Sequence, residues 1–223
     1  MGLIEIAVSQ GRKSLSEYES KLILSDYGIP VVEEKLAQNE PDFLSAVKSI
    51  GFPLAIKACA PEIAHKTDLD LIKLDIRTEQ EAKTVFYWIM ERIGAFQDAG
   101  VLVQRMAKGK REFMAGMTRD QQFGPCVMFG IGGILTEALD DVSFRVAPLE
   151  RSDASEMIHE IRGNKLLGPY RGMPPVNLTS LEDILLNLGR LGLENDRIQE
   201  VDLNPLIICE DMPVAVDALI VIN

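Results

Sequence analysis

The chain has 223 residues, with 23 basic and 34 acidic side chains and a formal net charge of −11. This length fits one large domain or two small lobes, and the 47% of hydrophobic residues suffices for a core. An acidic excess of this size repels polyanions, and the sequence has no basic stripe interleaved with aromatic residues. We therefore expect no nucleic-acid partner.

The cysteines and the apolar runs indicate the compartment. Cys59, Cys126 and Cys209 are far apart and each lies in an apolar stretch, which is typical of free thiols in a reducing environment. No apolar stretch reaches the roughly 20 residues that a membrane-spanning helix needs. The N-terminus has no signal-peptide pattern. We expect a cytoplasmic protein that does not bind membranes.

The first hundred residues predict helices and strands in alternation. Ser16 and Glu19 form a capping box, and Leu15, Tyr18 and Leu22 share one helical face, which together predict a helix at about 15–27. The further predicted elements are a helix from Pro41 to Ile50, a strand at 54–58, a polar loop at 60–70, a strand at 72–76 and a helix capped by Thr78 and Glu81 that runs to about 97.

From residue 101 the chain becomes rich in strands. The predicted elements are strands at 101–104, 112–118 and 125–129, a short helix that opens at 130–133 and contains Glu137, helices at about 151–162 and 180–193, the second capped by Thr179 and Glu182, and a final hairpin of 198–203 with 213–221. We expect an α/β fold of two α+β lobes that meet near 100–105, with a ligand in the cleft between them.

The final predicted hairpin carries polar side chains that a structural strand does not need. Glu200, Asp202 and Asn204 alternate with apolar residues and therefore project from one face, while Asp217 interrupts an apolar run. Oxygen ligands from two adjacent strands suit Mg²⁺ with its waters and nucleotide phosphates. The alternative is a solvated strand face on which Asp217 is paired with an arginine.

A glycine-rich turn at 130–134 follows an apolar strand and precedes a predicted helix. Its backbone N–H groups could approach a phosphate, but such a run is also typical of a plain tight turn. Arg119, Arg145 and Arg171 lie in apolar or glycine-containing stretches and are candidate phosphate ligands. Taken individually, each is more typical of a surface residue.

The chain has two histidines. His159 lies on a charged predicted helix, where a solvated position is the ordinary interpretation. His65 lies in the polar loop next to Lys66 and Asp68. A metal site there is disfavoured because no second histidine or cysteine is near, whereas an imidazole beside a cation can accept a phosphoryl group.

Five motifs occur in an order that is typical of one family. They are HisLysThrAsp at 65–68, GlnPheGlyProCysValMetPheGlyIleGlyGlyIle at 122–134, AspValSerPheArgValAlaProLeu at 141–149, TyrArgGlyMetPro at 170–174 and GluValAspLeuAsnProLeu at 200–206. The chain resembles the ATP-grasp β subunit of the NDP-forming acyl-CoA synthetases, of the ADP-forming acetate–CoA ligase type, related to succinyl-CoA synthetase. The resemblance extends from residue 15 to residue 221.

The resemblance implies an ATP-grasp fold whose two lobes close over a nucleotide. We expect an N-terminal helical segment at 1–28, a small lobe at 29–103 and a large lobe at 104–223 that contains a metal-binding hairpin. The implied cofactors are ATP or ADP and Mg²⁺. The implied reaction is acyl-CoA + ADP + phosphate ⇌ carboxylic acid + CoA + ATP, in which the ATP-grasp subunit exchanges the phosphoryl group with the nucleotide.

The resemblance also implies residue roles. His65 falls at the position of the family's β-subunit phosphohistidine and would be catalytic. Asn204 and Asp217 match the magnesium ligands, with Asp202 beside them. The residues expected to contact the nucleotide are Lys57, Gln104, Met106, Glu112, Arg119, Gly132, Gly133 and Arg145.

The chain departs from the family after the histidine motif, where Asp70 and Leu71 stand in place of two usual glycines. The exchange removes backbone freedom and adds a negative charge. A CoA-binding domain of about 100 residues or more does not fit beside the ATP-grasp motifs, so we expect a CoA-binding α subunit as partner in an α2β2 hetero-oligomer. The alternatives are another ATP-grasp carboxylate ligase, which needs no histidine, or a non-catalytic nucleotide-binding regulatory module.

Overall fold

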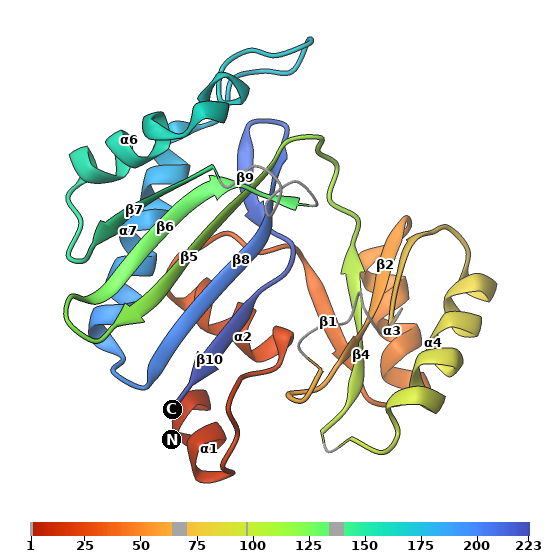
Figure 1. Ribbon diagram of the computed structural model, residues 1–223. Coiled ribbons are helices and arrows are strands. Elements are labelled where there is room, and N and C mark those ends of the chain that lie inside the picture. Colours follow the sequence, from red (N-terminus) through yellow and green to blue (C-terminus); the bar gives the residue numbers. More distant parts are fainter. Residues whose placement is uncertain (1, 64–70, 97, 134–140) are drawn as a thin grey trace.

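Two antiparallel sheets organise the protein, one in each of two lobes (Figure 1). The computed structural model describes residues 2–63, 71–96, 98–133 and 141–223. The described elements in chain order are α1 (Leu3–Ser9), α2 (Glu17–Asp26), β1 (Glu34–Ala37), α3 (Glu40–Ile50), β2 (Leu54–Cys59), β3 (Ile72–Ile76), α4 (Glu79–Ile93), β4 (Gly100–Arg105), β5 (Glu112–Asp120), β6 (Gly124–Ile131), β7 (Val142–Val146), α6 (Arg151–Glu160), the 3-10 helix η2 (Arg162–Leu166), α7 (Leu178–Glu194), β8 (Ile198–Cys209), β9 (Met212–Ala215) and β10 (Leu219–Ile222).

The small lobe is a four-stranded sheet in the order β1-β4-β2-β3, covered on one face by α3 and α4 (Figure 1). Local signals begin both helices, because Asn39 accepts a hydrogen bond from the Asp42 N–H at the start of α3 and Thr78 caps α4. The rings of Phe43 and Phe86 stack at a centroid distance of 4.5 Å. This contact joins the two helices above the buried strand β2.

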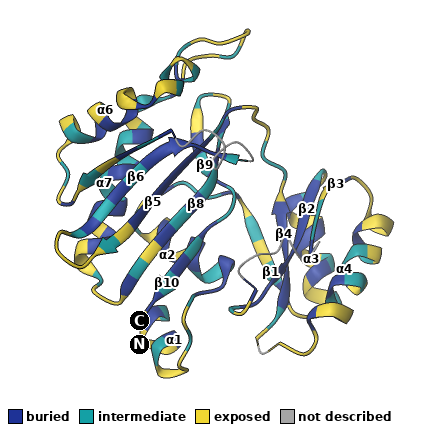
Figure 2. Ribbon diagram, viewed as in Figure 1, coloured by how far each residue is buried: buried dark blue, intermediate teal, exposed yellow. Residues whose placement is uncertain are grey.

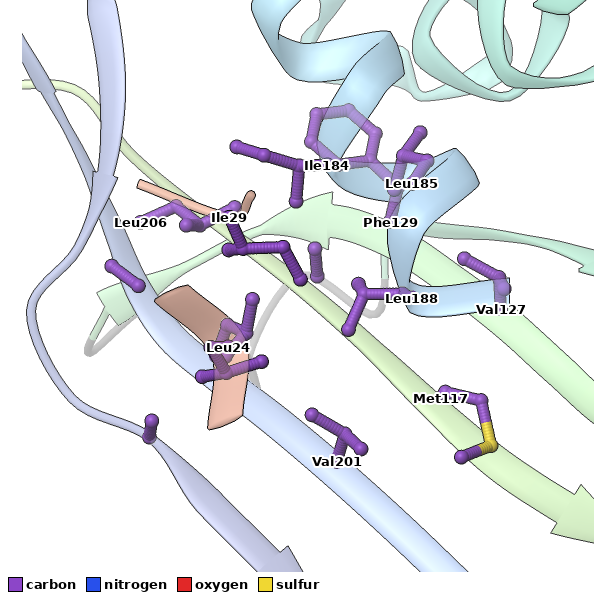
Figure 3. Close-up of a cluster of buried hydrophobic side chains, with 14 of the residues drawn as sticks. Leu24, Ile29, Met117, Val127, Phe129, Ile184, Leu185, Leu188, Val201 and Leu206 are labelled. Atoms are coloured by element: carbon purple, nitrogen blue, oxygen red, sulfur yellow. The ribbon is translucent and has the colours of Figure 1, made fainter. Parts of the chain in front are cut away.

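The large lobe is a six-stranded sheet in the order β10-β8-β5-β6-β7, with β9 paired to the far end of β8. Helix α7 packs on one face of it and places Leu185 and Leu188 against Val127, Phe129 and Met117 (Figure 3). The strands at the centre of both sheets are buried, whereas the outer faces of α4 and α6 are exposed (Figure 2).

The division between the sheets lies between Arg105, where β4 ends, and Glu112, where β5 begins. Helices α1 and α2 do not form a separate unit, since Ala7 and Leu24 lie in the same apolar core as the six-stranded sheet. The N-terminal helical segment predicted at 1–28 therefore packs with the large lobe.

Most of the predicted elements are confirmed within a few residues, including the capping box of Ser16 and Glu19. The predicted helical face was wrong, because Leu22 is 41% exposed while Lys21 is 2% exposed. The predicted cap of the last helix was also wrong. Asn177 caps α7 by accepting a hydrogen bond from the Ser180 N–H.

The final hairpin is more complex than predicted. Its second strand divides at a bend that contains Val216 and Asp217. Strand β9 before the bend pairs with the end of β8, and β10 after the bend pairs with the beginning of β8. Helix α1 and strands β1 and β7 were not predicted, and the helix expected to contain Glu137 falls at residues outside those described.

No helix in the described ranges is both long enough and apolar enough to span a membrane.

Candidate functional site

The register of the large-lobe strands brings Asn204 and Asp217 close together. Asp202 of β8 pairs with Leu219 of β10 in antiparallel register, so Asn204 lies beside the bend that holds Asp217. The Val216 N–H donates to the Pro205 carbonyl at 3.1 Å and fixes this bend against β8. Asp217 accepts a hydrogen bond from the Ala218 N–H at 2.9 Å.

Asp202 points to the same side of the sheet as Asn204, because both alternate with Val201 and Leu203, which lie in the core. Burial, followed by the negative charges of Glu200 and Asp217, raises the pKa of Asp202 to about 6. Its Oδ1 atom is buried without a hydrogen-bond partner among the described residues. A buried oxygen of this kind, beside a second carboxylate, is suited to a hard cation.

The predicted metal ligands include an amide oxygen as well as carboxylates. Within the described ranges, no group of three or more His, Cys, Asp or Glu side chains is arranged to hold a metal ion. The predicted ligands are the carboxylates of Asp202 and Asp217 and the amide oxygen of Asn204. A small number of protein ligands is sufficient for Mg²⁺, because the ion keeps several waters and binds nucleotide phosphates in its remaining positions.

The glycine turn at the end of β6 contacts Asn204, one of the predicted metal ligands. The Gly133 N–H donates to Asn204 Oδ1 at 3.0 Å, and the Gly132 N–H donates to the Glu112 carbonyl at 3.0 Å. Gly133 has φ +71, and a Cβ atom at this position would collide with the carboxylate of Glu112. The left-handed backbone favours glycine here, whereas the carboxylate of Glu112 lies at the end of a flexible side chain and can move aside.

Lys57 enters the same region from the small lobe. It lies on β2, is 3% exposed, and donates to Glu17 Oε1 at 2.8 Å and to the Val216 carbonyl at 3.0 Å. Val216 precedes Asp217, so the ammonium group of Lys57 lies next to the bend that carries the predicted metal ligand.

Gln104 and Met106 lie at the end of β4, where the small lobe passes into the large lobe. Gln104 is 1% exposed, and its Oε1 accepts a hydrogen bond from Lys21 Nζ at 3.3 Å. The Met106 N–H donates to the Pro53 carbonyl at 3.3 Å. These contacts fix the end of β4, where the chain passes from the small lobe to the large lobe.

The structure places Arg119 and Arg145 away from the predicted metal ligands. Arg119 donates to the carbonyls of Gly192, Asn195 and Ile198 and so fixes the end of α7. Arg145 faces α6, where its guanidinium forms ion pairs of 2.5 Å with Glu160 and 3.4 Å with Glu156. Both arginines point to the helix-covered side of the sheet, opposite Asp202 and Asn204.

A pocket of about 930 Å³ opens beside Glu112 and Gly132. Lys108, Lys110 and Arg171 supply basic groups at its wall. Its wall is fixed by Arg111, which is 3% exposed and donates to the carbonyls of Leu166, Gly168, Pro174 and Glu210.

His65 and Asp70 lie outside the described residues. Leu71, the second residue that replaces a family glycine, is 4% exposed in the small-lobe core, and its carbonyl accepts a hydrogen bond from the Ala58 N–H at 2.9 Å. An apolar side chain is thus packed at this position.

No site role was predicted for Glu17, Lys21 or Glu34. All three are charged and buried, and Lys21 Nζ lies 2.7 Å from a carboxylate oxygen of each glutamate. The spacing of Glu17 and Lys21, one turn apart on a predicted helix, was the available signal.

Comparison with known proteins shows that residues 6–222 match the ATP-grasp domain family. The ADP-forming acetate–CoA ligase I subunit beta of Pyrococcus furiosus is 45% identical, with 99% of this chain and 96% of that protein aligned. The ADP-forming acetate–CoA ligase I of Archaeoglobus fulgidus is 37% identical, and the alignment spans 90% of this chain and 30% of that longer protein.

Solved structures of an acetyl-coenzyme A synthetase are also similar to this chain. The dinucleotide forming acetyl-coenzyme A synthetase 1 of Ca. Korarchaeum cryptofilum, in complex with coenzyme A, Ca-AMPCP and HgCl+, superposes with a TM-score of 0.93 at 42% identity over 99% of this chain and 98% of that chain. The same synthetase with coenzyme A and Mg-AMPPCP, its phosphohistidine segment pointing towards the nucleotide binding site, gives a TM-score of 0.88 at 42% identity, again over 99% and 98% of the two chains.

Proposed function

Because the chain belongs to the ATP-grasp domain family, we propose that it is the nucleotide-binding β subunit of an ADP-forming acyl-CoA synthetase. The observation that carries this proposal is the position of Asn204 on β8 beside the bend that holds Asp217, where Asn204 also accepts a hydrogen bond from the N–H of Gly133. The similarity of the whole chain to a β subunit of that class supports it.

Different residues of the site would bind the metal ion and the nucleotide. Asn204, Asp217 and Asp202 would hold Mg²⁺, which when bound neutralises charge on the phosphates. Lys57 and the N–H groups of the glycine turn would bind phosphate oxygens, while Gln104, Met106 and Glu112 would contact the nucleoside. Arg119 and Arg145 would not contact the nucleotide, because their guanidinium groups bind the end of α7 and α6 respectively.

His65 is proposed as the phosphoryl acceptor. In the direction of ATP cleavage, the bond between the γ-phosphorus and the β,γ-bridging oxygen breaks, a nitrogen–phosphorus bond forms on the imidazole, and ADP leaves with the electron pair on its terminal oxygen. In the opposite direction ADP takes the phosphoryl group back. Positioning and charge neutralisation supply most of the catalysis in such transfers.

The acyl-CoA chemistry requires a CoA-binding module. One relative of similar length is a separate β subunit, whereas in longer relatives the match to this chain occupies only 30% of the protein. We propose a separate CoA-binding α subunit in an α2β2 assembly, located in the cytoplasm.

Incubation with γ-labelled ATP tests the proposal. We expect label on the wild-type chain that is labile to acid and stable to base, and no label on His65→Ala. The matched control is His159→Ala, because His159 is an exposed residue of α6 whose ring, in the described structure, bonds only to the Ser155 carbonyl. Label that persists in His65→Ala, or that is lost in His159→Ala, would contradict the assignment.

Addition of a CoA-binding α subunit tests the enzyme class. We expect acyl-CoA-dependent ATP formation from ADP and phosphate only when both subunits are present. A chain that binds Mg-ATP but is never labelled and gains no activity would instead be a regulatory nucleotide-binding module. Nucleotide-dependent ligation of a carboxylate to an amine would place the chain among the carboxylate–amine ligases.

A further inference from the structure

Four charged side chains are buried together where α2 meets the small lobe. Glu17 and Lys21 come from α2, Glu34 from β1 and Lys57 from β2, and we call this set the interlobe cluster. The side chains of Glu17, Lys21, Glu34 and Lys57 are 0%, 2%, 5% and 4% exposed. The cluster therefore joins an N-terminal helix of the large-lobe core to two strands of the small-lobe sheet.

The cluster is balanced in charge, with two carboxylates and two ammonium groups. Burial alone would lower the pKa of Lys21, but the charges of Glu17 and Glu34 outweigh burial and raise it. Burial raises the pKa of Glu34, and the ammonium of Lys21 opposes this effect. Removal of one member would leave an uncompensated buried charge, which is strongly destabilising. Buried ion pairs contribute little net stability over apolar side chains of the same volume, so their geometry needs another explanation.

Two oxygen atoms determine where the ammonium of Lys57 lies. Glu17 Oε1 accepts from Lys57 Nζ at 2.8 Å and from Lys21 Nζ at 2.7 Å. The Val216 carbonyl accepts from the same two nitrogens, at 3.0 Å and 2.7 Å. An ammonium group has three N–H donors, so these two contacts within the described part of the chain leave Lys57 one donor for a further acceptor.

From this geometry we infer that Glu17 is a positioning residue, which aims the remaining N–H of Lys57 at a nucleotide phosphate and ties it to the bend that carries Asp217. The inference rests on the proposed function, because it takes Lys57 as a phosphate ligand and Asp217 as a metal ligand. Helix α2 thus sets the position of a cation from one lobe relative to the metal site of the other. Glu17 itself does not contact the nucleotide.

A merely structural role makes a different prediction. If the interlobe cluster only held the lobes together, Glu17→Gln and Lys57→Met would each lower the free energy of unfolding and would leave the affinity of the folded protein for nucleotide unchanged. If Glu17 acts through Lys57, the effects on affinity cannot add, since a chain without Lys57 has no ammonium group to position.

The test is a double-mutant cycle on the affinity of the full chain for Mg-ADP, measured by isothermal titration calorimetry. We expect Glu17→Gln and Lys57→Met each to raise the Kd for Mg-ADP roughly tenfold or more, as for loss of a charge-assisted hydrogen bond. The double variant should bind no more weakly than Lys57→Met alone. The matched control is Glu79→Gln, which breaks another Glu–Lys pair with i,i+4 spacing, at 2.9 Å but exposed on α4, and should leave the Kd unchanged.

Two results would overturn the inference: wild-type affinity in either single variant, or additive effects in the double variant. Labelling of His65 by γ-labelled ATP in Lys57→Met reports on the proposed function separately, because labelling that persists keeps that function while the positioning role fails. If Glu17→Gln does not fold, Glu17→Gln/Lys21→Met removes one charge of each sign and keeps the interlobe cluster neutral. The same weakening of Mg-ADP binding is expected there, and wild-type affinity would contradict the inference.

Discussion

The side-chain amide of Asn204 and the backbone N–H of Gly133 are joined by a hydrogen bond of 3.0 Å. This bond links the end of β6 to the middle of β8, so the glycine turn and the predicted metal ligand share one fixed geometry. A displacement of either residue must move the other.

Gly133→Ala is expected to weaken nucleotide and metal binding together. The substitution places a Cβ atom against the carboxylate of Glu112 at a residue with φ +71. We expect a loss of roughly 1–3 kcal/mol in the free energy of unfolding from backbone strain, and a displaced Glu112 carboxylate. Urea denaturation measures the stability, and calorimetry with Mg-ADP measures the binding.

Gly124→Ala is the control for backbone strain alone. Gly124 has φ +77, but a Cβ atom added there would meet no other atom within 4 Å, and the residue is the first of β6, directly after the turn that follows β5. We expect lower stability with unchanged affinity for Mg-ADP. Equal loss of affinity in the two variants would show that the glycine turn has no specific role in the site.

The raised pKa of Asp202 predicts that the free energy of unfolding depends on pH when Mg²⁺ is absent. Its pKa rises from an ordinary value of 3.8 to about 6 in the folded protein. Between these values the folded state binds more protons than the unfolded state, so the free energy of unfolding falls as pH rises through this window. The loss is on the order of 2–3 kcal/mol by pH 7.5.

Comparison with Asp202→Asn isolates this residue from the other titrating groups. We expect the variant to gain stability relative to wild type as the pH rises from 4 to 7.5, measured by urea denaturation at each pH. Added Mg²⁺ should stabilise the wild type at pH 7.5 and should stabilise the variant much less. A stability difference that does not change with pH would contradict the elevated pKa.

Asp217→Asn should move the titration of Asp202 without abolishing its shift. Burial is the largest cause of the raised pKa, and the charges of Glu200 and Asp217 add to it. Removal of the Asp217 charge should therefore lower the pKa of Asp202 from about 6, although not to its ordinary value. Carboxyl chemical shifts followed by NMR during a pH titration measure this change, and an unchanged midpoint would mean that the two carboxylates do not interact.

Local signals predicted the fold well where neighbouring residues determine the structure. The capping box of Ser16 and Glu19 is an example, because both partners lie within one helical turn. The bend at Val216 was missed because its cause is distant in sequence. Strands β9 and β10 pair with opposite ends of β8, and apolar periodicity does not record which end a strand will choose.

The site residues, too, could be predicted only where neighbouring residues determine their position. Alternation along β8 was sufficient to place Asp202 and Asn204 on one face. The burial of Lys21 could not be inferred, because its partner Gln104 is 83 residues away and the Val216 carbonyl 195 residues away. Without those partners, the amphipathic pattern favoured Leu22 for the buried face.

Arg145→Met tests the exclusion of this arginine from the nucleotide site. Its guanidinium faces Glu160 and Glu156 of α6, and these ion pairs raise the pKa of Arg145 and lower that of Glu160. Pairs at the surface contribute little stability, so we expect a small decrease in the free energy of unfolding and an unchanged Kd for Mg-ADP. Lys57→Met, measured in the same titration, provides the contrast. A large loss of Mg-ADP affinity in Arg145→Met would mean that the guanidinium leaves α6 when nucleotide binds, and would return Arg145 to the site.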